Sequence, residues 1–310
     1  MKTLLICLLL AATQPADSLR VLFWNVENFF DWRNDSTSVS DAEFSSQGTR
    51  RWTRKRFKTK CDAIAKTILW AGMPDVIGLA EVENARVLKQ LLQETALRKL
   101  DYRIVHFDSP DTRGIDVALL YRASRAEFVS AKPCHLYASD SSVLATRDIL
   151  LAQLRTSAGS EIAFLVNHHP SKFGGAAASA GRRRLALMRL KQLADSLQAD
   201  GTTRILAMGD MNDTPENPAF QLLAPSLENR AENLHRQGKG TIKYEGQWEL
   251  IDMFFASPSA RTGPMRILQV PFLMTRDKAH TGTKPLRTYS GPRYVGGVSD
   301  HCPIQISIRM

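Results

Sequence analysis

Side chains that can bind metal ions or transfer protons follow short apolar runs along the chain. The runs at residues 19–24 and 75–80, for example, are followed by Asn25 and by Glu81. The full set is Asn25, Glu27, Glu81, Asn167, His168, Asp210, Asn212, Asp252, Asp300 and His301. It holds carboxylates, carboxamides and histidines but no cysteine, and such oxygen-rich sets suit Mg²⁺ or Mn²⁺ better than structural zinc. A bound cation would also let an anionic phosphodiester approach these acids.

Two of these motifs have spacings that indicate how the groups work together. Asp210 and Asn212 are two residues apart, which puts both side chains on one face of an extended chain. One can hold or deprotonate a water while the other hydrogen-bonds a phosphate oxygen. Asp300 and His301 are adjacent and point to opposite sides, so a separate acid must orient the imidazole, and Asp252 is our candidate. An Asp–His pair favours the protonated imidazole, which stabilises charge developing on a phosphate.

The elements that would position these side chains alternate along the chain. Apolar residues at helical spacing predict helices at 54–71, 84–98 and 176–199. Further strands are predicted at 102–107, 114–121, 125–130, 148–155, 265–270 and 303–309, and a short one at 250–251 leading to Asp252. Interleaved helices and many short strands predict an α/β sandwich, with two sheets packed face to face and helices outside. The polar, Ser-rich segment 33–53 is expected to be a long loop.

The composition limits the function classes. The 310 residues have 44% hydrophobic side chains, which excludes wholesale disorder and a polytopic membrane protein. The formal net charge of +10 favours phosphate-bearing or anionic partners, although a basic surface that only aids solubility explains it equally well. The chain lacks the sequence motifs of serine hydrolases, P-loop kinases, zincins and dinucleotide-binding enzymes.

The first residues have the pattern of a secretory signal peptide. Lys2 precedes a short apolar stretch, which is too short to span a bilayer, and Pro15 follows it. We therefore expect residues 1 to about 18 to be removed on export to the periplasm or medium, leaving one domain at 19–310. The alternative is an N-terminal strand or core helix. Cys61, Cys134 and Cys302 remain, which allows at most one disulfide.

Seven segments together resemble the endonuclease/exonuclease/phosphatase family, which includes deoxyribonuclease I and the exonuclease III-like nucleases. They follow the family's order from residue 21 to residue 304. These segments are 24–28, 77–83, 114–121, 167–171, 209–212, 251–253 and 299–301. Each motif is weak alone, whereas seven in order are specific. The resemblance implies a four-layer α/β/β/α sandwich with the active site at one end of the two sheets.

The resemblance also implies a metal site. Glu81 matches the family's principal metal-binding glutamate, and Asn25, Glu27 and Asp300 match positions around the same Mg²⁺ or Mn²⁺. The family usually has glutamine before this glutamate, whereas Ala80 stands there in this chain. Glu83 is therefore a second candidate for the ligand.

The remaining matched residues are implied to carry out phosphoester hydrolysis. Asp210 matches the aspartate that orients or deprotonates the attacking water, and Asn212 matches the asparagine that contacts the phosphate. His301 matches the histidine at the scissile phosphate, and Asp252 the aspartate paired with it. His168 matches a residue that assists the leaving group. The adjacent His169 is an alternative for this role, because the alignment can shift by one position.

The resemblance leaves the substrate open. We expect an exported endonuclease that acts on nucleic acid, with Asn167, Arg287 and Tyr289 as candidates for substrate binding. The alternative is a lipid or inositol phosphate substrate. A lipid substrate would require an exposed apolar hairpin, for which segment 270–274 is the candidate, although core packing explains it equally well. A non-catalytic binding protein is the third hypothesis. We expect a monomer without stable membrane insertion.

Overall fold

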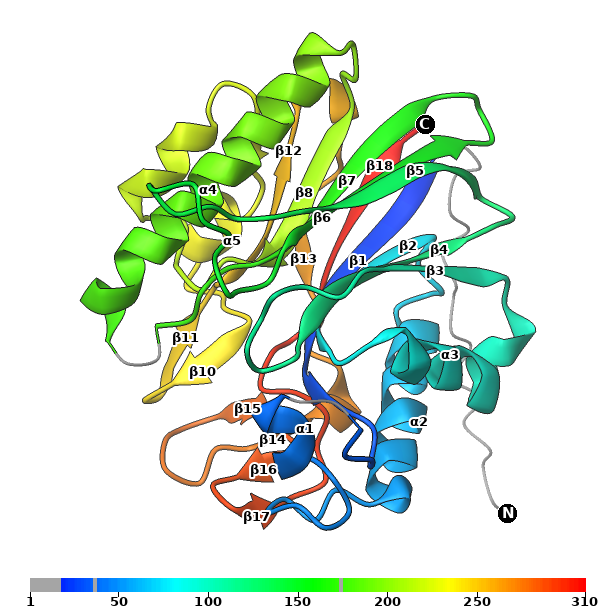
Figure 1. Cartoon of the computed structure of the whole chain (residues 1–310), viewed down its shortest axis with the longest axis vertical. Helices are drawn as coiled ribbons and strands as arrows, with labels where there is room; N and C mark the ends of the chain where they lie inside the picture. Colours follow the sequence, from blue (N-terminus) through cyan, green and yellow to red (C-terminus); the bar gives the residue numbers. More distant parts are fainter. Residues whose placement is uncertain (1–17, 36–37, 173–174) are drawn as a thin grey trace, which may run out of the picture.

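The computed structural model describes residues 18–35, 38–172 and 175–310, and Figure 1 shows their arrangement. The expected signal peptide, residues 1 to about 18, falls outside the described residues except for Ser18. That residue begins the first strand, β1 (Ser18–Phe29).

Two mixed six-stranded sheets form the centre of the molecule. The strands of the first sheet are, in spatial order, β13 (Arg266–Ile267), β18 (Ile304–Arg309), β1, β2 (Val76–Val82), β4 (Asp116–Arg122) and β3 (Tyr102–His106). Those of the second are β5 (Ala126–Cys134), β6 (Ile149–Thr156), β7 (Glu161–His168), β8 (Ile205–Asp210), β12 (Asp252–Ala256) and β9 (Glu228–Asn229). In each sheet one pair is parallel, β1 with β2 and β7 with β8, and the other pairs are antiparallel.

Strand β1 shows how the layers form, because its side chains alternate between two cores. Val21 and Phe23 belong to the core that includes residues of both sheets, whereas Leu22 and Trp24 face the helices α2 (Arg54–Trp70) and α3 (Ala85–Glu94). Helix α4 (Ala176–Ala199) covers the outer face of the second sheet (Figure 1). The result is the predicted four-layer α/β/β/α sandwich.

Local sequence signals explain where the two helices over the first sheet begin. The side chain of Thr53 accepts a hydrogen bond from the Arg56 amide at the start of α2. Asn84 accepts hydrogen bonds from the amides of Arg86 and Val87 at the start of α3. These caps satisfy amides that have no partner within the helix.

Shorter elements lie in the connections between these strands and helices. Three of them are hairpins: β10 (Ile242–Tyr244) with β11 (Gln247–Glu249), β14 (Met274–Arg276) with β15 (Thr283–Pro285), and β16 (Tyr289–Ser290) with β17 (Arg293–Tyr294). Two are short helices, α1 (Val39–Glu43) and α5 (Glu232–Arg236). The 3₁₀ turns are η1 (Ala96–Lys99), η2 (Pro218–Leu223), η3 (Pro258–Ala260) and η4 (Pro271–Leu273). In Figure 1, α1 and the hairpins β14–β15 and β16–β17 lie together below the sheets.

Several predicted boundaries were wrong. The strand expected at 250–251 instead begins at Asp252, because the apolar residues of this strand follow the acid rather than precede it. The predicted loop at 33–53 contains α1, and helix 84–98 ends at Glu94 before η1. The strand expected at 265–270 is only Arg266–Ile267. Within the described part of the chain, no helix has the length and apolar character needed to cross a membrane.

Candidate active site

The chemically competent side chains meet because parallel strands end at the same edge of a sheet. Asn25 and Glu81 lie where the regular pairing of β1 with β2 stops, and His168 and Asp210 are partners at the ends of β7 and β8. Asp252 is the register partner of Asp210 at the start of the antiparallel strand β12. The β1 and β8 strands pack against each other, which brings the two edges together.

The Asn25 side chain links the two sheets. It is buried, and its Nδ2 lies 3.1 Å from Asp210 Oδ2 and 3.5 Å from Glu81 Oε1. Its Oδ1 accepts a hydrogen bond from the Glu27 amide. A single carboxamide therefore sets the separation between the predicted metal-binding glutamate and the predicted water-activating aspartate.

Irregular backbone orients the two glutamates. Glu27, Asn28 and Glu81 have φ angles of 49°, 50° and 63°, in the left-handed region that non-glycine residues seldom adopt. The register between β1 and β2 shifts here, and a bulge of this kind re-aims side chains at a strand end. Glu81 Oε2 accepts a hydrogen bond of 2.7 Å from the Asn28 amide. Strained residues of this kind cluster at functional sites.

Asp210 and Asn212 face the same region, but a turn rather than an extended strand places them there. Strand β8 ends at Asp210, whose Oδ1 accepts a hydrogen bond of 2.9 Å from the Asn212 amide. Asn212 has a φ of 51°, and its Nδ2 donates to the carbonyl of His169. Burial raises the pKa of Asp210 to about 7, because the carboxylate loses solvation and Asp252 lies close by, although His301 opposes this.

The pair that the sequence assigned to Asp252 and His301 is present in the structure. His301 Nδ1 lies 2.8 Å from Asp252 Oδ2, and His301 Nε2 lies 3.7 Å from Asp210 Oδ2. Burial alone would lower the pKa of His301, but the carboxylates of Asp252 and Asp210 raise it well above its usual value. Trp24 Nε1 donates to the His301 carbonyl, which fixes the backbone of this loop. The imidazole is thus held as a cation beside Asp210.

His168 reaches the site, whereas its neighbours do not. His168 Nε2 lies 3.7 Å from Asp210 Oδ2, and burial together with Arg147 lowers its pKa well below the usual value. Asn167 is fully buried, and its Nδ2 donates to the carbonyls of Leu165 and Met208. His169 lies in a different cavity, which helix α4 and η2 also line. The alternation along β7 separates Asn167 from His168, so the geometry gives no support to substrate binding by Asn167.

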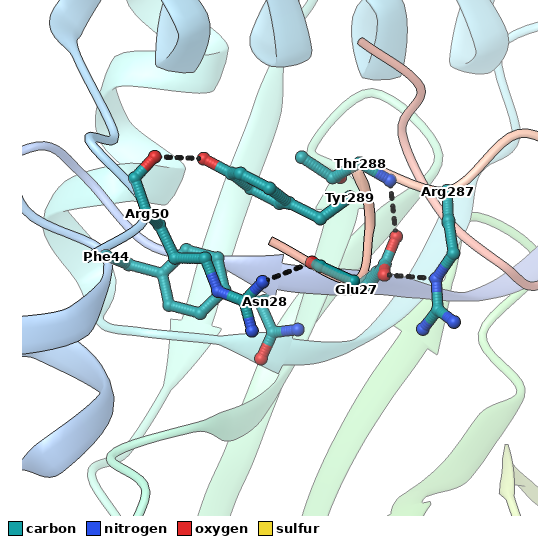
Figure 2. Close-up of a pocket in the computed structure, with 8 residues that line it drawn as sticks. Glu27, Asn28, Phe44, Arg50, Arg287, Thr288 and Tyr289 are labelled. Carbon is teal, nitrogen blue, oxygen red and sulfur yellow. Dashed lines mark hydrogen bonds and ion pairs between the residues drawn. The ribbon is translucent and has the colours of Figure 1, made fainter. Parts of the chain in front are cut away.

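Arg287 connects Glu27 to Asp300. Its Nε lies 3.2 Å from Glu27 Oε1, and its Nη2 lies 2.8 Å from Asp300 Oδ2. The other oxygen of Glu27 accepts a hydrogen bond of 2.8 Å from the Thr288 amide. Burial and the nearby Asp300 carboxylate raise the pKa of Glu27 to about 7. Figure 2 shows the Glu27 carboxylate between Arg287 and Thr288.

Glu27, Arg287 and Thr288 form one side of a cavity of about 230 Å³ beside the predicted metal-binding residues. Asn28, Phe44, Arg50 and Tyr289 line the rest of it (Figure 2). The Tyr289 hydroxyl donates to the Arg50 carbonyl, and the Tyr289 ring packs against Phe44. Tyr289 therefore contributes to the cavity wall, and the Arg287 side chain is half-exposed.

Sequence reasoning missed Lys60. This buried lysine donates hydrogen bonds to the Glu27 carbonyl and to Thr288 Oγ1. Desolvation lowers its pKa to about 8, although Glu27 and Glu81 oppose the shift. A lysine on the apolar side of a predicted helix, at position 60 between Phe57 and Ile64, was the available signal. It anchors α2 to the strand that carries Glu27.

The donor set fits a hard divalent cation. Glu81 offers a carboxylate near the strand end, with the Glu27 and Asp300 carboxylates nearby. Asn25 presents its Nδ2 to Glu81, so its side-chain amide would have to turn over to offer the oxygen to a cation. Burial is the main reason for the raised pKa values of Asp210 and Glu27, and a bound cation would favour their ionised forms. Among the described residues, Asp210, Asp252 and His301 form a compact donor group, whereas Glu27, Glu81 and Asp300 do not. Which of these residues bind the metal remains a prediction.

Comparisons with known proteins agree with this geometry. The sequence model of the Endonuclease/Exonuclease/phosphatase family matches residues 20–310. A comparison with curated proteins gave no match.

Solved structures with the same fold include the human nocturnin catalytic domain with bound sulfate, which is 17% identical over 94% of each chain, with a TM-score of 0.60. A mannosyl-6-phosphatase from Bacteroides thetaiotaomicron is 16% identical over 94% of this chain and 100% of its own, with a TM-score of 0.60. Truncated TDP2 from Caenorhabditis elegans is 14% identical over 94% of this chain and 98% of its own, with a TM-score of 0.61.

At these identities the solved structures establish the fold alone, whereas the sequence model spans almost the entire described chain. Members of the matched family are generally metal-dependent phosphoester hydrolases. The chain therefore belongs to the endonuclease/exonuclease/phosphatase family.

Proposed function

We propose that the protein is an exported, Mg²⁺- or Mn²⁺-dependent phosphodiesterase that cleaves nucleic acid. The observation that carries the proposal is the position of Asp210, which contacts Asn25 on one side and faces the Asp252–His301 pair on the other. Asp210, which can take a proton from water, and the His301 imidazolium, which can bind the phosphate, thus lie 3.7 Å apart. The net charge of +10 supports a polyanionic substrate.

Each residue has a separate role in an in-line attack of water on the phosphate. Asp210 accepts the proton of the attacking water, and its raised pKa makes the carboxylate a better base at neutral pH. His301 Nε2 is 3.7 Å from Asp210, too far for a direct hydrogen bond, so this N–H can reach a phosphate oxygen. Asn212 gives a second contact to the phosphate. A cation bound at Glu81 would polarise the phosphoryl oxygen and screen the acids.

We assign to His168 the role of stabilising the leaving group. Because burial lowers its pKa, His168 is neutral at pH 7, so its N–H donates a hydrogen bond to the leaving oxygen and a water molecule supplies the proton that this oxygen takes up. Arg287, half-exposed beside the metal-binding region, binds a non-bridging phosphate oxygen of the substrate.

The candidate membrane hairpin gives the lipid alternative little support. Val270 and Leu273 are buried in the core beneath α2 and α3, whereas Phe272 and Met274 are half-buried. The activity test below also asks whether the protein hydrolyses an inositol phosphate or a sugar phosphate. A binding protein without activity is disfavoured, because each predicted catalytic position has a competent side chain.

Export rests on the apolar stretch after Lys2 and on the family match, which begins at residue 20. Cell fractionation followed by N-terminal sequencing of the recovered protein tests it. A mature chain that begins near residue 18 supports export, and an intact Met1 contradicts it.

The activity is tested with supercoiled plasmid. We expect the purified protein to nick it with Mg²⁺ or Mn²⁺, not with chelator, and His301→Ala to reduce nicking at least 100-fold with an unchanged circular dichroism spectrum. Bis(p-nitrophenyl) phosphate, inositol phosphates and mannose 6-phosphate are tested in parallel. A folded parent that hydrolyses one of these small esters but never nicks plasmid would contradict the nuclease assignment.

A further inference from the structure

The start of helix α2 and its neighbours carry a dense positive charge. Residues 50–60 contain seven Lys or Arg side chains and no Asp or Glu. One of them, Lys60, is buried beneath the catalytic region, whereas most of the others face solvent. We define the α2 basic surface as Arg33, Arg51, Arg54, Lys55, Arg56 and Arg293.

Most of this charge is not neutralised by the protein itself. Within the described residues, carboxylates pair with Arg50 and Lys58, and Asp31 lies 3.6 Å from Arg33. Arg51, Arg54, Lys55 and Arg56 make no salt bridge to a described carboxylate, in contrast to the many paired arginines elsewhere in the protein. Like charges this close repel one another, and an anionic partner would relieve that repulsion.

Aromatic rings hold the guanidinium groups in place. Arg33 and Arg54 lie 4.9 and 5.4 Å from the centre of the Trp32 ring, and Arg56 lies 4.2 Å from that of Tyr294. Such stacking reduces the entropy lost when an arginine binds phosphate. Because arginines already occupy these rings, the surface is suited to phosphate contacts rather than to stacking of bases. Phosphate contacts carry no direct sequence information.

The α2 basic surface is continuous with the catalytic region. Arg56 Nη1 donates to the carbonyls of Arg50 and Arg51, and Arg50 lines the same cavity as Arg287 (Figure 2). Arg287 in turn contacts Asp300, next to His301. A chain of phosphates leaving the site would therefore meet Arg287, then Arg50, and then the exposed cations.

We propose that the α2 basic surface binds the phosphate backbone of a nucleic acid whose scissile phosphate lies at Asp210 and His301. The inference rests on the proposed nuclease function and makes the substrate a polymer that extends past Arg287. The surface would supply affinity that is independent of base sequence and weakened by salt.

The test is direct binding without turnover. A fluorescein-labelled duplex of about 20 base pairs is titrated in chelator at 50–200 mM NaCl, and the Kd is measured by anisotropy. We expect the double variant Arg54→Glu/Lys55→Glu to weaken binding at least tenfold at 100 mM NaCl. The slope of log Kd against log salt should fall by about 2, near one for each lost phosphate contact. Glutamates at a helix start are favourable, so this variant retains its fold.

The matched control is Arg98→Glu/Lys99→Glu, which reverses two exposed charges in η1, an element outside the α2 basic surface. Its Kd should stay within twofold of the parent. An equal loss in both variants, or no loss in Arg54→Glu/Lys55→Glu, would overturn the inference. Binding to phosphatidylserine vesicles that depends on Arg54 and Lys55, with unchanged DNA binding, would overturn it in favour of a membrane. Hydrolysis of bis(p-nitrophenyl) phosphate separately reports whether the catalytic site works, so failure of the activity and failure of the surface are distinguishable.

Discussion

At the scale of single residues, the charge state of His301 depends on Asp252, 49 positions away in the sequence. Asp252 raises the pKa of His301, so the imidazolium is present at neutral pH and is lost only as the pH rises through that raised value. In Asp252→Asn the cation is lost at a lower pH. We expect kcat for bis(p-nitrophenyl) phosphate to fall about 10²–10³-fold, and the alkaline limb of the kcat–pH profile to move to lower pH.

Asp195→Asn is the control for this change, because Asp195 pairs with Lys191 on the surface of α4, in a different part of the fold. It should leave both kcat and the profile at parent values. If Asp252→Asn lowers kcat but keeps the parent's alkaline limb, Asp252 acts on position alone and not on the charge of His301.

Of the residue-scale predictions, the pairing of His301 with Asp252 is present at hydrogen-bond distance. Strand alternation was not the reason for it, because Asp300 and His301 lie in a bend before β18 and Asp300 Oδ1 is 3.9 Å from His301 Nε2. Alternation does explain why Asn167 and His168, adjacent at the end of β7, face different surroundings. The Arg287–Glu27 contact joins residues 260 positions apart, and no local pattern predicts such a pair.

At the scale of elements, strands β2 and β8 approach so closely that a side chain at Gly78 would force neighbouring side chains to move. A Cβ at Gly78 would lie 2.9 Å from Met208 Sδ and 3.1 Å from the Phe23 ring. We expect Gly78→Ala to lower the free energy of unfolding by about 1–3 kcal/mol, measured by urea denaturation. Met208→Ala in the same chain should recover part of this loss, because the two positions are in contact.

Gly181→Ala is the matched control on α4. Nothing lies within 4 Å of its added Cβ, and its backbone is helical. Alanine should therefore raise the free energy of unfolding by about 0.5–1 kcal/mol. If both alanines act in the same direction, close approach of the sheets is not the reason for Gly78.

Element prediction was accurate for long periodic segments and poor for short ones. The helix predicted at 176–199 is α4 itself, because its apolar stripe repeats over several turns. The strand expected at 250–251 begins instead at Asp252, since two apolar residues do not distinguish a strand from the turn before it. Helix α1 has five residues and depends on packing of Phe44 against Phe30, which local propensity does not reveal.

At the scale of the whole molecule, assembling the active site between two sheets buries titratable groups that must stay neutral. Burial lowers the pKa of His169 to about 3, and neither of its ring nitrogens has a hydrogen-bond partner among the described residues. In the unfolded chain the same imidazole binds a proton near pH 6.5 (about its unperturbed value). The unfolded state therefore binds more protons between these two values. This contribution to stability is complete above the unfolded pKa and is lost as the pH falls.

His169→Leu should remove this pH-dependent contribution to the free energy of unfolding. Relative to the parent, the variant should gain about 1.4 kcal/mol of unfolding free energy per pH unit below about 6.5, or about 2 kcal/mol by pH 5. Urea denaturation of both proteins in chelator, at pH 7.5, 6.0 and 5.0, measures the difference directly. The pKa values of Asp210 and Glu27 are raised, so these groups affect stability in the opposite direction as the pH falls. Their effect cancels in this comparison because the parent and the variant share both residues.

Leu187→Ala is the control, because it removes an apolar side chain from the same cavity wall and its cost in unfolding free energy should not change with pH. Parallel curves for His169→Leu and the parent would show that His169 does not titrate differently on unfolding.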